Sequence, residues 1–181
     1  MDSLHFYIAL FFHLAFLITG FGAVLVIDTF GLLMLLGRQT LEQVKKVAEV
    51  TQKLIWLGWV GMVVSGANLI WLKGYVDNLT KIKIFFVVLI GLNGIFLHLI
   101  KKHAVDRFQN KSDIPKIWMF RMGLASAISQ TGWWGALVIG FIHRHIAHNI
   151  PSPDNPYIWM ILIAGAFGLI TVVGESTIKN S

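Results

Sequence analysis

Seven histidines are the side chains of this 181-residue sequence best suited to chemistry, because a neutral imidazole nitrogen can bind haem iron, copper or zinc. His13 lies inside the first long apolar stretch, and His143, His145 and His148 follow the end of the fourth. If these two stretches cross a membrane in opposite directions, His13 and His143 lie at the same depth, near its outer surface. We therefore predict that they ligate one metal centre from different helices.

The residues around these histidines favour a flat cofactor, b-type haem, over a bare ion. Zinc and other divalent sites commonly use a carboxylate, yet the sequence beside the outer histidines offers only Asp2 and Asp154. The residues that share a helical stripe with His143 are Ser129, Trp133, Ala136 and Gly140. Small residues leave room for a macrocycle on which Trp133 would pack, although they also allow two helices to pack closely.

Two other interpretations stay open. The first is an outward-facing copper or zinc site, built from His13, His143, His145 and His148 with His5 nearby. In the second, the histidines bond only to water or lipid headgroups, and the chain is a cofactor-free accessory or structural subunit of a larger membrane complex. The sequence contains no cysteine, which excludes disulfides, thiolate metal sites, iron–sulfur clusters and covalently attached haem.

A second group of polar residues falls in the inner halves of the apolar stretches. Asp28, His98 and Arg121 belong to the first, third and fourth stretches. A charge buried in lipid is costly unless it is paired, so we expect Asp28 to bridge Arg121 or to be protonated. These residues would join three helices, carry protons or, at Arg121, support the haem. Asn93 adds a polar group whose default role is a hydrogen bond between helices.

Five apolar stretches must carry these residues, and they cover residues 4–36, 54–72, 84–100, 117–142 and 158–173. A membrane-spanning helix needs about 20 mostly apolar residues. The sequence is 56% hydrophobic and only 13% charged, whereas soluble domains carry about 25% charged residues. We therefore predict an all-α, polytopic membrane bundle of five transmembrane helices, forming a single integral membrane domain over residues 1–181.

Lysine and arginine gather on one side of this predicted bundle. Eleven of the 15 fall in the first and third loops, at their borders, or in the C-terminal tail. Because positively charged loops stay in the cytoplasm, the N-terminus should lie outside and the C-terminus inside, in a cell inner membrane that the chain crosses several times. The formal net charge of +6 is thereby assigned to anionic lipid, and not to nucleic acid.

Four segments carry a resemblance to a known family, and they are HLAFLITGFGAVLVID, TQKLIWLGWVGMVVSGANLI, KIKIFFVVLIGLNGIFLH and FRMGLASAISQTGWWGALVIG. Their order, over about Leu4 to Phe141, resembles the small polytopic membrane proteins of the HemJ and CopD-like group, which includes haem-binding and copper-resistance types. The resemblance implies a bundle of four or five helices with His13 as a candidate haem ligand. Asn93 stands near the place of a histidine in the HemJ type, and the proline-arginine motif of the first helix is missing. These departures argue against protoporphyrinogen oxidation as the activity, but they are compatible with haem binding.

The expected function is therefore membrane electron transfer by b-type haem, held by His13 and by His143 or His145. Two protein ligands leave no open position on the iron for a substrate, so no catalytic residue is predicted. The expected partners are the lipid bilayer and either a redox partner or a larger membrane complex.

Overall fold

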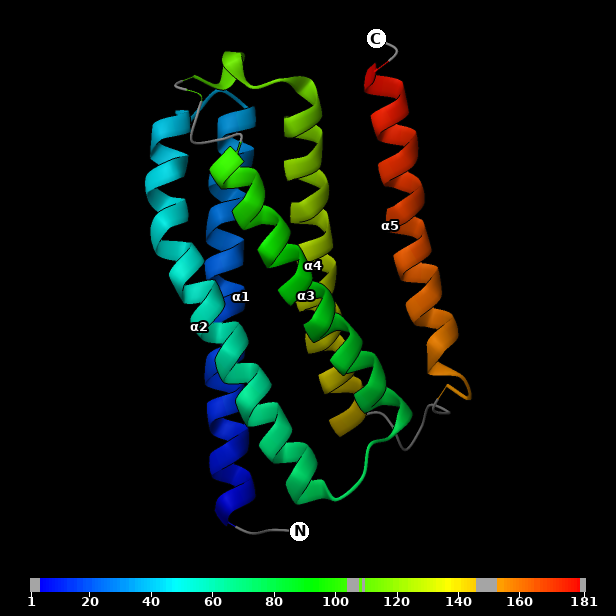
Figure 1. The fold of residues 1–181 in the computed structure, drawn as a ribbon. Coiled ribbons are helices and arrows are strands. Elements are labelled where there is room, and N and C mark those ends of the chain that lie inside the picture. Colours follow the sequence, from blue (N-terminus) through cyan, green and yellow to red (C-terminus); the bar gives the residue numbers. More distant parts are fainter. Residues whose placement is uncertain (1–3, 104–107, 109, 146–152, 180–181) are drawn as a thin grey trace. The chain divides into compact units, whose positions relative to one another are not determined.

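The computed structural model describes residues 4–103, 108, 110–145 and 153–179, and within these residues the chain is helical, with no strand. The α-helices are α1 (Leu4–Leu35), α2 (Leu41–Lys73), α3 (Asn78–His103), α4 (Lys116–His145) and α5 (Pro156–Lys179), and a short 3-10 helix, η2, covers Lys111–Asp113 (Figure 1). The predicted all-α class is confirmed. The helices form two compact units, of which the first holds α1 and α2 and the second holds α3, α4 and α5.

Four of the helices, α1, α2, α3 and α5, are long and apolar enough to cross a membrane. This finding supports the predicted membrane-spanning character of the chain. The fourth helix in order, α4, does not belong to this group, and its middle carries the polar residues Ser126, Ser129, Gln130 and Thr131. A fifth span therefore stays a prediction.

The helices α2, α3, α4 and α5 extend beyond the apolar stretches from which they were predicted. The largest difference is at α2, which begins at Leu41 instead of residue 54, so most of the first predicted loop is the first part of α2. Thr40 starts this helix with a capping box, in which its hydroxyl accepts from the backbone N–H of Gln43 and the Gln43 side chain accepts from the N–H of Thr40. No proline interrupts the chain between Thr40 and Lys73, so the helix continues.

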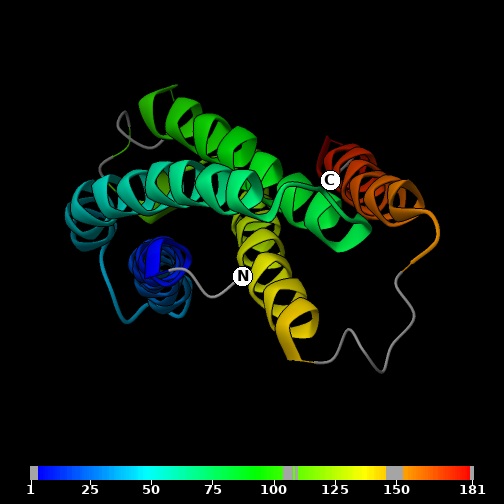
Figure 2. The same cartoon turned by 90° about the horizontal axis from the view of Figure 1, so that it is seen from below.

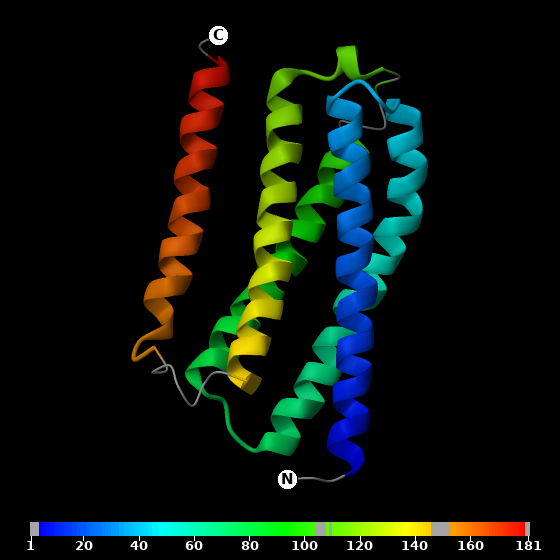
Figure 3. The ribbon, with the colours of Figure 1, turned by 180° about the vertical axis from the view of Figure 1, so that it is seen from behind.

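The first unit is an antiparallel helical hairpin (Figures 1 and 3). Its turn uses Gly37, whose φ of 73° lies in the left-handed region, and the N–H groups of Gly37 and Arg38 close the end of α1 on the carbonyls of Met34 and Leu33. The helices touch at Gly58, where an added Cβ would lie 2.5 Å from the Cα of Gly20. This close approach sets the register in which the two helices face one another.

The second unit is built on α3 and α4, which pack against one another at an angle (Figure 2). Glycines of α4 receive side chains of α3: an added Cβ at Gly132 would meet Ile90, and one at Gly135 would meet the ring of Phe86. Trp133 is fully buried in this region, and the side-chain amide of Asn93 donates to the carbonyl of Ala125 at 2.7 Å. The predicted helix-joining hydrogen bond of Asn93 is thus present.

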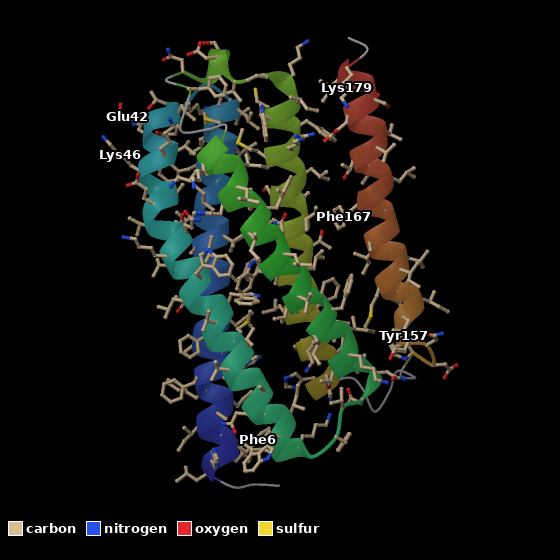
Figure 4. All side chains as sticks on the ribbon, in the orientation of Figure 1. Phe6, Glu42, Lys46, Tyr157, Phe167 and Lys179 are labelled. Atoms are coloured by element: carbon tan, nitrogen blue, oxygen red, sulfur yellow. The ribbon has the colours of Figure 1, made fainter. Side chains whose placement is uncertain are left out.

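The last helix, α5, meets the other two helices of its unit at few places. Near its end the ring of Phe120 fills the space beside Gly174, and Phe167 extends from α5 toward α4 (Figure 4). Most of its large apolar side chains are exposed, namely Tyr157, Ile158, Trp159, Ile161, Leu162, Leu169, Ile170, Val172 and Val173. An apolar surface of this kind is suited to lipid.

Candidate functional site

His13 lies on the face of α1 that meets α2, and its ring is held by a short chain of hydrogen bonds. Its Nδ1 is 2.9 Å from the hydroxyl oxygen of Ser65 in α2. The Ser65 hydroxyl in turn donates to the backbone carbonyl of Gly61, one turn earlier, at 2.6 Å. Ser65 is buried, whereas the histidine ring is half-buried. The hydrogen bond to Ser65 therefore fixes the position of Nδ1 in the imidazole.

Gly66 provides the space for this ring. A Cβ added there would lie 3.3 Å from Cε1 of His13 and 3.7 Å from Nδ1, so the helix backbone of α2 runs directly alongside the imidazole. The antiparallel hairpin brings these residues together, because the contact between Gly20 and Gly58 fixes which residues face each other further along. Nothing in the sequence singled out Ser65 or Gly66 as partners of His13; the only available signal was that both residues are small.

His143, near the end of α4, forms a different pair. Its Nε2 is 3.1 Å from Oδ2 of Asp77, the residue that precedes α3. The other oxygen of Asp77 accepts from the backbone N–H of Thr80 at 2.7 Å and so caps α3. The expectation that carboxylates are absent beside the outer histidines, Asp2 and Asp154 apart, is therefore wrong. The folding of α3 back toward α4 supplies a carboxylate from a part of the sequence that lies far from His143.

The remaining outer histidines do not extend either arrangement. His145 belongs to α4 but is exposed, with its ring 4.9 Å from that of Phe141, and His5 is exposed on α1. His148 lies outside the described residues. Within the described part of the chain, no three histidine, aspartate or glutamate side chains form a group that could hold a metal ion.

Two residues of the α4 stripe, Ser129 and Trp133, lie on the packed side of that helix. Ser129 is buried, and Trp133 has no exposed surface at all, with its indole Nε1 among the buried atoms. An added Cβ at Gly140 would meet nothing within 4 Å, so there is open space beside α4 one helical turn before His143. The contact of this stripe with a cofactor stays a prediction.

Arg121 has a carboxylate partner that the sequence did not indicate. Its Nε donates to Oε1 of Glu175 in α5 at 2.7 Å, and its guanidinium lies 5.1 Å from the centre of the Trp118 ring. The arginine therefore joins α4 to α5. Asp28 belongs to the other unit, so its predicted bridge to Arg121 stays a prediction, as does the meeting of either residue with His98.

These two arrangements differ in what they can do. His13 presents an oriented imidazole whose second nitrogen, Nε2, is the one that commonly binds haem iron or a metal ion. In the pair at His143, the ionised carboxylate of Asp77 can only accept a hydrogen bond, so Nε2 of His143 donates to it. His13 and His143 belong to different units, and a single site that uses both stays a prediction.

Comparisons of the chain with protein-family models, with curated proteins and with solved structures find no match.

Proposed function

We propose that this chain is a polytopic membrane protein that binds b-type haem through His13 and takes part in membrane electron transfer. The observation that carries the proposal is the hydrogen-bond chain from Nδ1 of His13 through Ser65 to the carbonyl of Gly61. Histidines that bind metals usually donate their other ring N–H to a fixed acceptor, which orients the ring and raises its basicity.

The residues around His13 fit a haem ligand in chemistry and in space. The imidazole is held at Nδ1, so Nε2, the nitrogen remote from the main chain, points away from Ser65. Gly66 adds no side chain beside the ring. His13 would hold the iron, and bound haem would supply reversible one-electron transfer there.

His143 is proposed as the second residue that would hold the haem, with His145 as the alternative from the sequence. In the present arrangement Nε2 of His143 is bound to Asp77, so the histidine would have to exchange that contact for the iron or use Nδ1. His145 is exposed, but it follows His143 by two helical residues and so faces a different direction. The support for His13 is therefore stronger than the support for either residue of α4.

Spectroscopy of the detergent-purified protein tests this function. We expect a Soret band and a reduced-minus-oxidised spectrum of the b type, and we expect His13→Ala to remove both. His5→Ala is the matched control, because His5 is an exposed histidine of the same helix, and its spectrum should equal that of the wild type. A protein purified without haem, or an unchanged spectrum in His13→Ala, would contradict the proposal.

A second candidate function is the handling of copper or zinc at the outer side, and the pair of Asp77 and His143 favours it. A carboxylate on one ring nitrogen with a metal ion on the other is a common arrangement in metalloproteins. Metal-stripped protein should then bind one copper or zinc ion, and His143→Gln should lose this binding. Co-purification with larger subunits in a fixed ratio, without haem or metal, would instead support the accessory-subunit interpretation.

The proposed function places the chain in a cell inner membrane with five spans, an outer N-terminus and a cytoplasmic C-terminus. The support is the distribution of lysine and arginine, because most of them belong to the first and third loops, which share one side when α2 and α3 span. With α4 as a further span, Lys179 in the C-terminal tail lies on that side too. Under this topology His13 and His143 both belong to the outer half of the membrane.

A further inference from the structure

The hydroxyl group of Ser65 has a single hydrogen, and the structure shows where that hydrogen points. The oxygen of Ser65 lies 2.6 Å from the carbonyl oxygen of Gly61 and 3.4 Å from that of Met62. Carbonyl oxygens only accept hydrogen bonds, and two oxygens at 2.6 Å without a hydrogen between them would repel one another. The Ser65 hydroxyl therefore donates to Gly61, as serine commonly does to the carbonyl four residues earlier in a helix.

This assignment determines the role of His13 in the contact with Ser65. The serine oxygen has already used its hydrogen, so toward Nδ1 of His13 at 2.9 Å it offers only a lone pair. Nδ1 must then carry the hydrogen of the imidazole. We infer that Ser65 is a positioning residue that holds His13 in the Nδ1–H tautomer, so that in the neutral ring Nε2 carries the lone pair.

The inference defines the class of ligand that His13 can take. A neutral Nε2 with a lone pair binds an electron-pair acceptor, such as iron, copper or zinc, and it repels an anion. A transition-metal centre therefore fits the nitrogen, and a carboxylate or phosphate does not. The role of Ser65 as a positioning residue rests on the proposed function, whereas the tautomer itself does not.

Gly66 keeps the ring in the place where this hydrogen bond forms. A side chain at position 66 would contact Cε1, the carbon between the two ring nitrogens, at 3.3 Å. A methyl group there must displace the ring or the helix by a few tenths of an ångström. Gly66 and Ser65 thus orient the ring together, one by its size and the other by its hydrogen bond.

Nitrogen NMR of the full-length protein, labelled with ¹⁵N-histidine in lipid nanodiscs without added haem, tests the inference. The signals of His13 are those lost in His13→Gln, and the protonated and unprotonated ring nitrogens are distinguished by their chemical shifts. We expect Nδ1 to be the protonated nitrogen in the wild type. Ser65→Ala removes the hydrogen bond that favours this tautomer. The ratio of the two tautomers should then shift by roughly two- to tenfold, the effect of one net hydrogen bond.

Two isosteric variants separate the hydrogen bond from the packing. Ser65→Thr and Ser65→Val add the same extra volume, but only threonine keeps a hydroxyl that can donate to Gly61. We expect Ser65→Thr to retain the Nδ1–H tautomer and Ser65→Val to lose it. Thr51→Val is the matched control, because the Thr51 hydroxyl donates to the Val47 carbonyl in the same helix at 2.9 Å, about 21 Å along the helix from Ser65.

The outcomes for the tautomer and for the function can be told apart. A wild-type His13 protonated at Nε2, or equal tautomer ratios in Ser65→Thr and Ser65→Val, would overturn the inference whatever the haem content. An Nδ1–H tautomer in a protein that never binds haem would support the tautomer assignment and contradict the proposed function alone. Where haem is present, Ser65→Val should also change its reduction potential while Thr51→Val leaves it unchanged.

Discussion

At the level of single residues, Gly58 is the position where the hairpin tolerates the least change. A methyl group there would lie 2.5 Å from two backbone atoms of Gly20 and 2.8 Å from the carbonyl of Phe16, and backbone cannot rotate away as a side chain can. We expect Gly58→Ala to lower the free energy of unfolding by about 1 to 3 kcal/mol, the usual cost of overpacking. Unfolding in mixed micelles with increasing SDS would measure this loss.

Gly22→Ala is the matched control for this prediction. An added Cβ at Gly22 would meet nothing within 4 Å, although Gly22 lies in the neighbouring helix only two residues from Gly20. Alanine favours a helix over glycine by up to about 1 kcal/mol, so stability should stay equal or rise slightly. Equal losses in both variants would show that helix flexibility, and not the contact, makes glycine necessary.

Individual residues also show which parts of the candidate site could be predicted from the sequence. His13 could be selected from its residue type and its place in an apolar stretch. Its partner Ser65 could not, because the two are 52 positions apart and only the packing of α1 on α2 brings them together. Asp77 was missed for the same reason: its contact with His143 depends on how α3 and α4 fold onto each other.

At the level of elements, the start of α3 depends on Asp77. One carboxylate oxygen caps the backbone N–H of Thr80, and the other binds His143. We expect Asp77→Ala to destabilise the first turn of α3 by about 1 kcal/mol, measured as faster hydrogen exchange at the Thr80 amide. Asp77→Asn keeps a good cap and should leave this amide protected. If Asp77→Asn exposes it equally, the charge facing His143 is what matters.

The attachment of α5 to α4 should depend on the ion pair of Arg121 and Glu175. These side chains are partly exposed, at 31% and 21%, so the pair is expected to contribute at most about 1 kcal/mol. Glu175→Gln should therefore speed hydrogen exchange at the end of α5 by up to roughly fivefold.

Glu42→Gln is the control for this ion pair. Glu42 pairs with Lys46 at the same distance of 2.7 Å, but both side chains are more than 70% exposed and stand on the surface of α2 (Figure 4). Exchange in α2 should not change measurably. An equal response to Glu42→Gln and Glu175→Gln would contradict a specific role of Arg121 in holding α5.

The elements themselves were predictable in number and type but not in length. Apolar stretches mark where a helix can lie in lipid, whereas helix ends are decided by caps and turns. Thr40 with Gln43 starts α2 thirteen residues before its apolar part, and Gly74, with a φ of 78°, ends it. The charged residues between Leu41 and Lys53 favour a helix as well as a loop, so composition alone cannot decide between them.

For the whole molecule, the absence of cysteine makes the proposed topology simple to test. Single cysteines at exposed positions, Val76→Cys, Ser112→Cys and Asp154→Cys, need no removal of native thiols. If α3 and α4 both span the membrane, an impermeant thiol reagent applied from outside should label positions 76 and 154 and leave 112 unlabelled. Labelling of 112 and 154 from the same side would show that α4 does not cross.

At this scale the sequence was most informative about the class of protein. Composition and apolar length indicate helices that cross a membrane, because lipid leaves few other ways to satisfy the backbone. The division into two units was not predicted, since the loop at residues 74–77 looks like any other short connection. Nor could the sequence show which side chains of α5 lie against its neighbours, because nearly every position of that helix is apolar.

The length of α2 connects the contact at His13 with the exposed first turn of the same helix. Because α2 is one continuous helix from Leu41 to Lys73, Ser65 lies about 36 Å along the helix from its first residue. A protein or a charged surface that binds near Glu42 would therefore contact the same helix that holds His13 through Ser65.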